Sequence, residues 1–131
     1  MLRSILAVTL LGTSSLALAE GAHGIWKTEA NDVGGYLEVT IGPCDSDPKL
    51  TCGIISSAFN KDGVDPAYEN LGKLMIRDMK PHGEDAYAGG TIWDPEHDKT
   101  YKSKMTVKGD DLDVEGCISI VCTGEHWKRV Q

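Results

Sequence analysis

Apolar and polar residues alternate along most of this chain, and an alternation with a period of two is typical of half-buried β-strands. The pattern is clearest at 35–41, 101–108 and 112–118, where apolar residues face one way and polar residues the other. The other expected strands are shorter or less regular, and they lie at 24–29, 51–57, 73–79, 86–93 and 125–130. The sequence therefore predicts eight strands and an all-β domain.

The connections between these strands are mostly of hairpin length. Clusters of Asp, Asn, Gly and Pro predict turns at 31–35, 94–98 and 108–111. One longer connection carries helix signals, with Asp65 as N-cap, Pro66 at the first position and Gly72 as a stop, so we expect one short helical turn there. Eight short strands joined in this way predict an antiparallel up-and-down barrel, with a β-sandwich as the alternative.

The first nineteen residues have the three parts of a secretory signal. Arg3 precedes an apolar run at 5–11, and Ala-Leu-Ala at 17–19 supplies the small residues that a signal peptidase reads. The apolar run is too short to cross a hydrocarbon core of about 30 Å. We therefore expect cleavage between Ala19 and Glu20, a single mature domain at 20–131, a periplasmic or secreted location, and no membrane insertion.

The charge of the chain limits its partners. With 13 Lys and Arg against 20 Asp and Glu, the net charge is −7. Such a chain is a poor match for nucleic acid, whose binding depends on clustered Lys and Arg. A length of 131 residues is typical of one domain, and we expect a monomer.

Four cysteines lie in the part of the chain that we expect to be exported, where an even number of cysteines indicates disulfides. Of the three possible pairings, Cys44–Cys52 with Cys117–Cys122 is favoured because each pair flanks a turn-like stretch. Each bridge would stabilise the fold by roughly 2–3 kcal/mol. A zinc site is the alternative, but neither spacing is C-x₂-C and no histidine lies at ligand spacing, so we expect no metal.

The two ends of the domain resemble those of lipocalin-type barrels. A G-x-W motif, Gly24 to Trp26, opens the first expected strand, and Arg129 lies near the end of the last. The resemblance implies that the arginine covers Trp26 and closes the barrel through a cation–π contact of roughly 0.5–2 kcal/mol. In an eight-stranded meander these two residues would lie at the same end.

A more extensive resemblance is to the small exported bacterial proteins grouped as domain of unknown function 2147. Seven ordered blocks carry it, at 24–28, 41–44, 50–55, 90–95, 99–101, 112–117 and 127–130. The resemblance implies a lipocalin-like barrel and no settled activity. The chain departs from the family pattern at 96–98 and in the connection at 58–72.

Catalytic signals are weak. The four histidines, His23, His82, His97 and His126, form no metal-binding spacing, and no G-x-S-x-G elbow is present. The acidic clusters at 84–85, 94–98 and 110–113 lack the periodicity of a calcium loop and are typical of charged turns. We therefore expect no enzymatic activity and no cofactor.

A barrel that binds a small apolar ligand is the leading hypothesis. Its mouth would be rimmed by 29–35, 58–72, 94–99 and 118–121, with 58–72 as a lid. Side chains expected to face inward with Trp26 and to line a ligand site are Leu37, Val39, Leu74, Ile76, Trp93, Tyr101, Met105 and Val114. Two alternatives remain open at this point: these side chains fill a solid core, or the acidic domain inhibits or escorts a basic protein partner.

Overall fold

A computed structural model describes residues 21–131. The predicted secretory signal and its cleavage site lie outside the described residues. Within residues 21–131 the chain forms strands and turns, and no helix there is long and apolar enough to cross a membrane.

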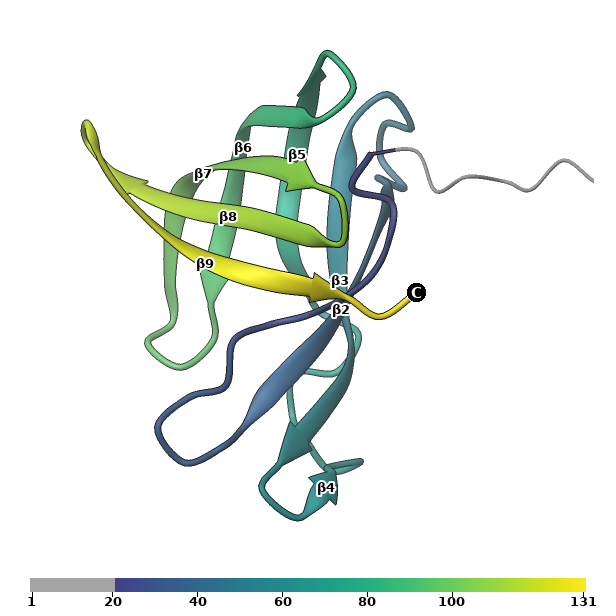
Figure 1. Cartoon of the computed structure of the whole chain (residues 1–131), viewed down its shortest axis with the longest axis vertical. Helices are drawn as coiled ribbons and strands as arrows, with labels where there is room; N and C mark the ends of the chain where they lie inside the picture. The colour runs from purple at the N-terminus through teal and green to yellow at the C-terminus, as the bar shows by residue number, and fades with distance from the viewer. Residues whose placement is uncertain (1–20) are drawn as a thin grey trace, which may run out of the picture.

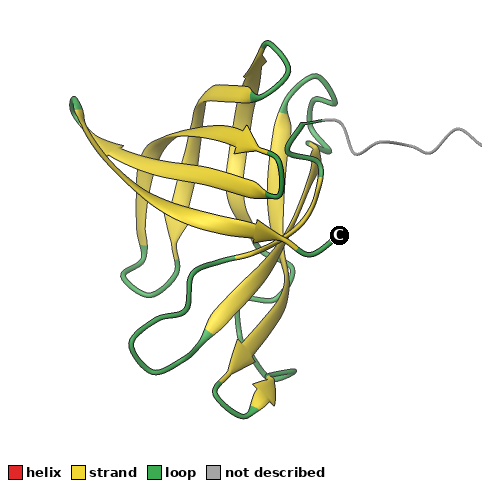
Figure 2. Ribbon diagram, in the orientation of Figure 1, coloured by secondary structure: helices red, strands yellow, loops and turns green. Residues whose placement is uncertain are grey.

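Nine antiparallel strands follow one another along the chain and curl into a barrel (Figures 1 and 2). They are β1 Gly24–Lys27, β2 Tyr36–Pro43, β3 Thr51–Asn60, β4 Gly63–Val64, β5 Leu74–His82, β6 Ala86–Asp94, β7 Lys99–Lys108, β8 Asp111–Ile118 and β9 Val121–Arg129. β1 pairs with β9 and β2 with β3, so eight strands close into a ring, while the two-residue β4 pairs only with the end of β3. The predicted all-β, eight-stranded up-and-down barrel is confirmed.

The helical turn expected within 65–72 is replaced by successive tight turns. Asp65 does act as a local cap, because its Oδ1 accepts a hydrogen bond from the Ala67 backbone at 3.2 Å. A helix does not continue because the Gly72 N–H donates to the Ile55 carbonyl at 2.8 Å and the Ile55 N–H donates to Lys73 at 3.0 Å. The connection is thus held against β3 before β5 begins.

One end of the barrel is closed by buried tryptophans. Trp26 and Trp127 are both fully buried, and the Trp26 Nε1 donates to the Ala22 carbonyl at 2.8 Å. The Arg129 guanidinium lies 4.2 Å from the Trp26 ring centre and donates to the carbonyls of His23 and Gly21, each at 2.9 Å. The largest fully buried side chains are Trp26, Trp127, Ile55, Ile76, Met79, Met105, Leu112 and Val39.

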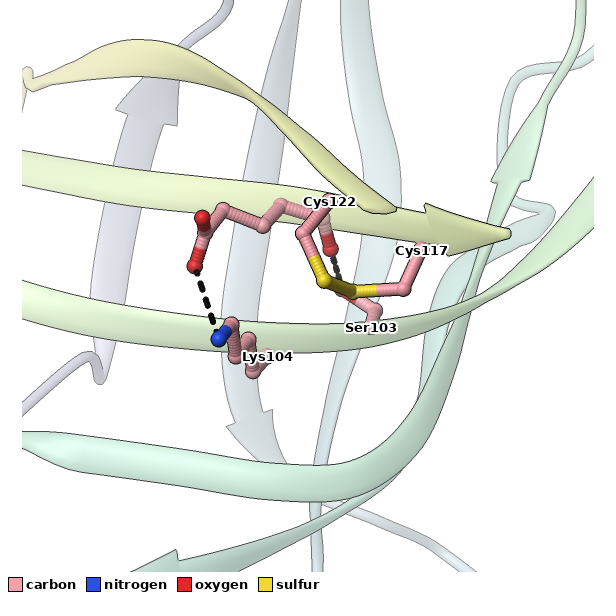
Figure 3. The surroundings of a disulfide bond; sticks show 5 residues. Ser103, Lys104, Cys117 and Cys122 are labelled. Atoms are coloured by element: carbon pink, nitrogen blue, oxygen red, sulfur yellow. Dashed lines mark hydrogen bonds and ion pairs between the residues drawn. A yellow bond between two sulfur atoms is a disulfide. The ribbon is translucent and has the colours of Figure 1, made fainter. Parts of the chain in front are cut away.

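Two disulfides join neighbouring strands at opposite ends of the barrel. Cys44 is bonded to Cys52 beside the β2–β3 turn, and Cys117 to Cys122 across β8 and β9. Around the second bridge, Ser103 and Lys104 of β7 reach β8 (Figure 3): the Ser103 hydroxyl donates to the Glu115 carbonyl at 2.6 Å. The bridge clamps the hairpin of β8 and β9, which projects beyond its neighbours at the left of Figure 1.

Candidate functional site

The end of the barrel opposite Trp26 and Arg129 is hollow. A cavity of about 450 Å³ opens there between the connections that follow β1, β4 and β6. A second cavity of about 220 Å³ adjoins it and extends between β6, β7, β8 and β9. Met75, Asp94, Pro95 and Glu125 line both cavities and therefore mark the boundary between them.

Part of the lining is apolar and aromatic. In the larger cavity Leu37, Ala58, Tyr68 and Met75 pack on or belong to the core. At the mouth the rings of Tyr36 and Phe59 stack with their centres 4.6 Å apart. The smaller cavity adds Ile92, Trp93, Tyr101 and Val114. A ligand in this site would thus contact a continuous apolar wall.

The rest of the lining is acidic. Six carboxylates line the larger cavity, and among the described residues neither cavity is lined by a lysine, arginine or histidine. The six come from the connections after β1, β4 and β6, from the end of β6 and from β9: Glu29, Asp32, Asp65, Asp94, Glu96 and Glu125. The site therefore has one sign of charge.

Several of these carboxylates are held in place by hydrogen bonds. Glu96 accepts one at 2.9 Å from the amide of Asn31, which ties the β1–β2 connection to the β6–β7 turn. Asp94 accepts the Glu96 N–H at 3.0 Å and contacts the His97 ring at 2.8 Å. Glu29 accepts the backbone N–H of His126 at 2.8 Å. The outer rim is therefore pre-organised.

Glu125 lies deeper than the rim carboxylates. It lies two residues before the buried Trp127 on β9. Because residues two apart on a strand share a face, both side chains point to the barrel interior. Its one side-chain hydrogen bond is a long one, 3.5 Å from the Trp127 Nε1. Burial raises the pKa of the Glu125 carboxyl above its usual range, and the charges of Glu29, Asp94 and Glu96 raise it further, against the opposing effect of the Trp127 hydrogen bond.

This raised pKa predicts how Glu125→Gln changes stability with pH. The carboxyl of Glu125 binds its proton at a higher pH in the folded chain than in the unfolded chain. The ionised carboxylate therefore destabilises the fold at pH values above the raised pKa. That destabilisation is relieved as the pH falls through the raised pKa towards the ordinary value of 4.5. Above this window the variant is more stable by less than about 1 kcal/mol, because solvent screens the partly exposed group.

Urea unfolding of both proteins between pH 4 and pH 8 measures the difference. Titrating groups that do not interact with Glu125 cancel in it, including Asp113, whose pKa is lowered by its hydrogen bond to Lys108. A difference in stability that does not change with pH would contradict the prediction.

The predicted lining residues divide into two groups. Leu37 lines the larger cavity, and Trp93, Tyr101 and Val114 line the smaller one. The others line neither cavity: Val39, Ile76 and Met105 are buried in the core, and Leu74 is half-buried outside both. The alternation of residues predicts which face of a strand points inward, but not how far along the barrel axis each side chain lies.

The sequence reasoning missed the acidic part of the site and the aromatic pair Tyr36 and Phe59. A signal for Glu125 was present, because it is two residues from Trp127 on a predicted strand and so shares its face. The rim carboxylates carried no such signal, since acidic residues in turns are usually solvated. Their convergence depends on how the barrel closes.

Within the described part of the chain, one group of side chains has metal-binding spacing, namely Cys44, Cys52 and Asp78. Its two sulfur atoms are bonded to each other. They are therefore not available as the thiolates that a metal such as zinc requires.

Comparison with known proteins identifies a family by sequence and a solved structure of similar fold. A family model described as an uncharacterized protein conserved in bacteria (DUF2147) matches residues 24–129. No curated protein matches the chain. Among solved structures, protein HP1028 from Helicobacter pylori, described as belonging to the lipocalin family, superimposes with a TM-score of 0.63 at 17% identity, covering 83% of this chain and 82% of that one.

Proposed function

This chain belongs to the DUF2147 family of uncharacterised bacterial proteins, and from that premise we propose that it is an exported binding protein that holds one small, partly apolar molecule at the barrel mouth. The observation that carries this proposal is the cavity of about 450 Å³ at the open end. Its volume is in the range usual for small-molecule sites. Eight-stranded barrels of this kind are wide enough to hold one small ligand.

The arrangement of the core favours this proposal over a solid barrel. The large buried side chains Trp26, Trp127, Leu112 and Val39 fill the closed end. Packing at the mouth is incomplete, and the space is bounded by both apolar and charged groups. A ligand with a matching surface would fill this space and remove the apolar part of the lining from water.

In the part of the chain that the structure describes, the lining of the two cavities offers no serine or cysteine nucleophile and no histidine base. The carboxylates are therefore the groups of the lining that can act as acids or bases. Export is supported by the predicted signal at 1–19 and by the two disulfides, which are typical of oxidising compartments.

A pair of tryptophan substitutions on one loop tests ligand binding. Ala30 lines the larger cavity, whereas Val33 is 76% exposed on the same loop and does not line it. We expect the neutral dye N-phenyl-1-naphthylamine to bind saturably to the wild type. Ala30→Trp should occupy the cavity and weaken dye binding at least about tenfold, a loss of roughly 1.4 kcal/mol in binding free energy. Fluorescence titration measures this.

Val33→Trp is the control and leaves the affinity for the dye unchanged. If Ala30→Trp binds the dye as tightly as the wild type, or if Val33→Trp weakens binding as much as Ala30→Trp does, the mouth cavity is not a ligand site.

A basic protein partner is the second candidate, favoured by a different observation. Ile118, Ile120 and Val121 at the tip of the β8–β9 hairpin are 69%, 94% and 66% exposed, close in sequence to Thr123 and Glu125 of the acidic site. Apolar side chains beside a single sign of charge fit a basic protein surface. Binding of a basic lysozyme should then weaken steeply with added salt, and no binding at low salt would refute this candidate.

A further inference from the structure

We infer that the ligand is a cation with an apolar body, such as a primary amine on a hydrocarbon chain, an inference that rests on the proposed ligand site. The same site would reject anionic amphiphiles such as fatty acids. The space of about 450 Å³ combines an apolar wall with carboxylates and, among the described residues, no cationic side chain lines it. A ligand must complement both surfaces.

Glu125 defines where the positive charge binds. It lies at the boundary of the two cavities, half-buried, with one long hydrogen bond from Trp127. Glu29, Asp94 and Glu96 are close enough to disfavour its charged form. A ligand ammonium group between these carboxylates would relieve their mutual repulsion, and partial burial makes the attraction stronger than at an open surface.

Two aromatic rings of the lining already have cationic neighbours. Within the chain itself, the Lys27 ammonium lies 4.2 Å from the Tyr36 ring centre and the Lys73 ammonium 5.9 Å from the Trp93 ring centre. Lys73 also donates to the Asn70 side chain at 2.8 Å, and neither lysine lines a cavity. These lysines therefore leave the carboxylates around Glu125 without a counter-charge from the lining.

The apolar body of the ligand would extend from Glu125 into the smaller cavity. Met75 lines both cavities beside it, and the smaller cavity continues along Trp93, Tyr101 and Val114. An unbranched chain attached to the ammonium group would lie along this wall. An anionic head group on the same chain would face the six carboxylates and be repelled.

Three ligands that share a chain of ten carbon atoms but differ in the charge of the head group separate the contribution of charge from that of apolar contact. They are decylamine, decan-1-ol and decanoate, each titrated into the protein by calorimetry at pH 7.5. We expect decylamine to bind with one-to-one stoichiometry, decanol at least about tenfold more weakly, and decanoate about a hundredfold more weakly. Glu125→Gln should weaken decylamine about tenfold and strengthen decanoate.

Asp45→Asn is the matched control, since Asp45 is exposed beside the β2–β3 turn at the closed end and loses the same charge. It should leave all three affinities unchanged. If Glu125→Gln fails to fold, Glu96→Gln on the exposed rim replaces it, with a smaller loss expected.

The outcomes distinguish the two proposals. If decanol or decanoate binds as tightly as decylamine, or if Asp45→Asn weakens decylamine as much as Glu125→Gln, the cation inference is overturned and the ligand site stands. The same holds if the dye binds but decylamine does not. If neither the dye nor any of the three chains binds, both proposals fail.

Discussion

Replacing Trp26 with alanine should lower the free energy of unfolding by about 3–5 kcal/mol. The side chain is fully buried, and it lies on the four-residue strand β1, which joins β2 to β9 and so closes the ring. Its loss leaves a large void, removes the hydrogen bond to Ala22 and leaves the Arg129 guanidinium without its aromatic partner. Denaturant unfolding monitored by circular dichroism measures the effect.

Trp93→Ala is the comparison for this substitution. Trp93 is partly exposed at the mouth and lines the smaller cavity. Its removal should cost less than half as much, because less apolar surface returns to water and the void is open to solvent. Equal losses in the two variants would mean that Trp26 does not hold the barrel closed.

Gly90→Ala should be similarly damaging although it adds a single carbon atom. A Cβ at this position would lie 2.1 Å from the carbonyl oxygen of Arg77 and 2.8 Å from the backbone nitrogen of Met79. Both contacts are with the main chain of β5, which cannot rotate away as a side chain would. We expect a loss of about 3 kcal/mol or more, since overpacking is here combined with displaced strand pairing.

Gly42→Ala provides the control in β2. A Cβ there meets no atom within 4 Å, and the residue has no positive φ. The change should be close to neutral, because alanine also reduces the conformational freedom of the unfolded chain. Comparable losses for Gly90→Ala and Gly42→Ala in thermal unfolding would contradict the close approach of β5 and β6.

The close approach at Gly90 also shows which part of the fold was beyond sequence reasoning. Alternation predicted strands at 73–79 and 86–93, and β5 and β6 are there. Between Arg77–Thr91 and Lys80–Ala88 the pairing is interrupted, and Asp78 and Gly89 adopt φ values of 56° and 82°. On the other side of β6, the pairing with β7 shifts register between Tyr87 and Gly90. Such a bulge depends on curvature imposed by the whole barrel, which a local pattern does not contain.

Strand lengths were similarly underestimated where pairing overrides local sequence. The last strand was predicted to begin at residue 125, yet β9 begins at Val121. Cys117 and Cys122 are direct partners in the pairing of β8 and β9, which extends the hairpin to a turn at Ser119 and Ile120. The apolar residues at this tip are exposed, so their hydrophobicity carried no information about the core.

For the candidate site, three of the connections expected at the mouth, 29–35, 58–72 and 94–99, contribute lining residues, whereas 118–121 lines neither cavity, and the charge of the site was not predicted. Tyr101 and Val114 were expected to face inward, and both line the smaller cavity. The carboxylates Glu29, Asp94 and Glu125 come from three separate parts of the chain and converge only in the closed barrel. Convergence of this kind follows from topology rather than from any local motif.

The closure of the barrel by Arg129 also determines where a linker or a solid support can be attached to the protein. Its guanidinium binds the Gly21 carbonyl at 2.9 Å, and the Gln131 carbonyl accepts the Ile25 N–H at 2.6 Å. Gly21 and Gln131 therefore both lie at the end of the barrel away from the cavity. A linker or solid support joined at Gln131 would leave the mouth facing solution.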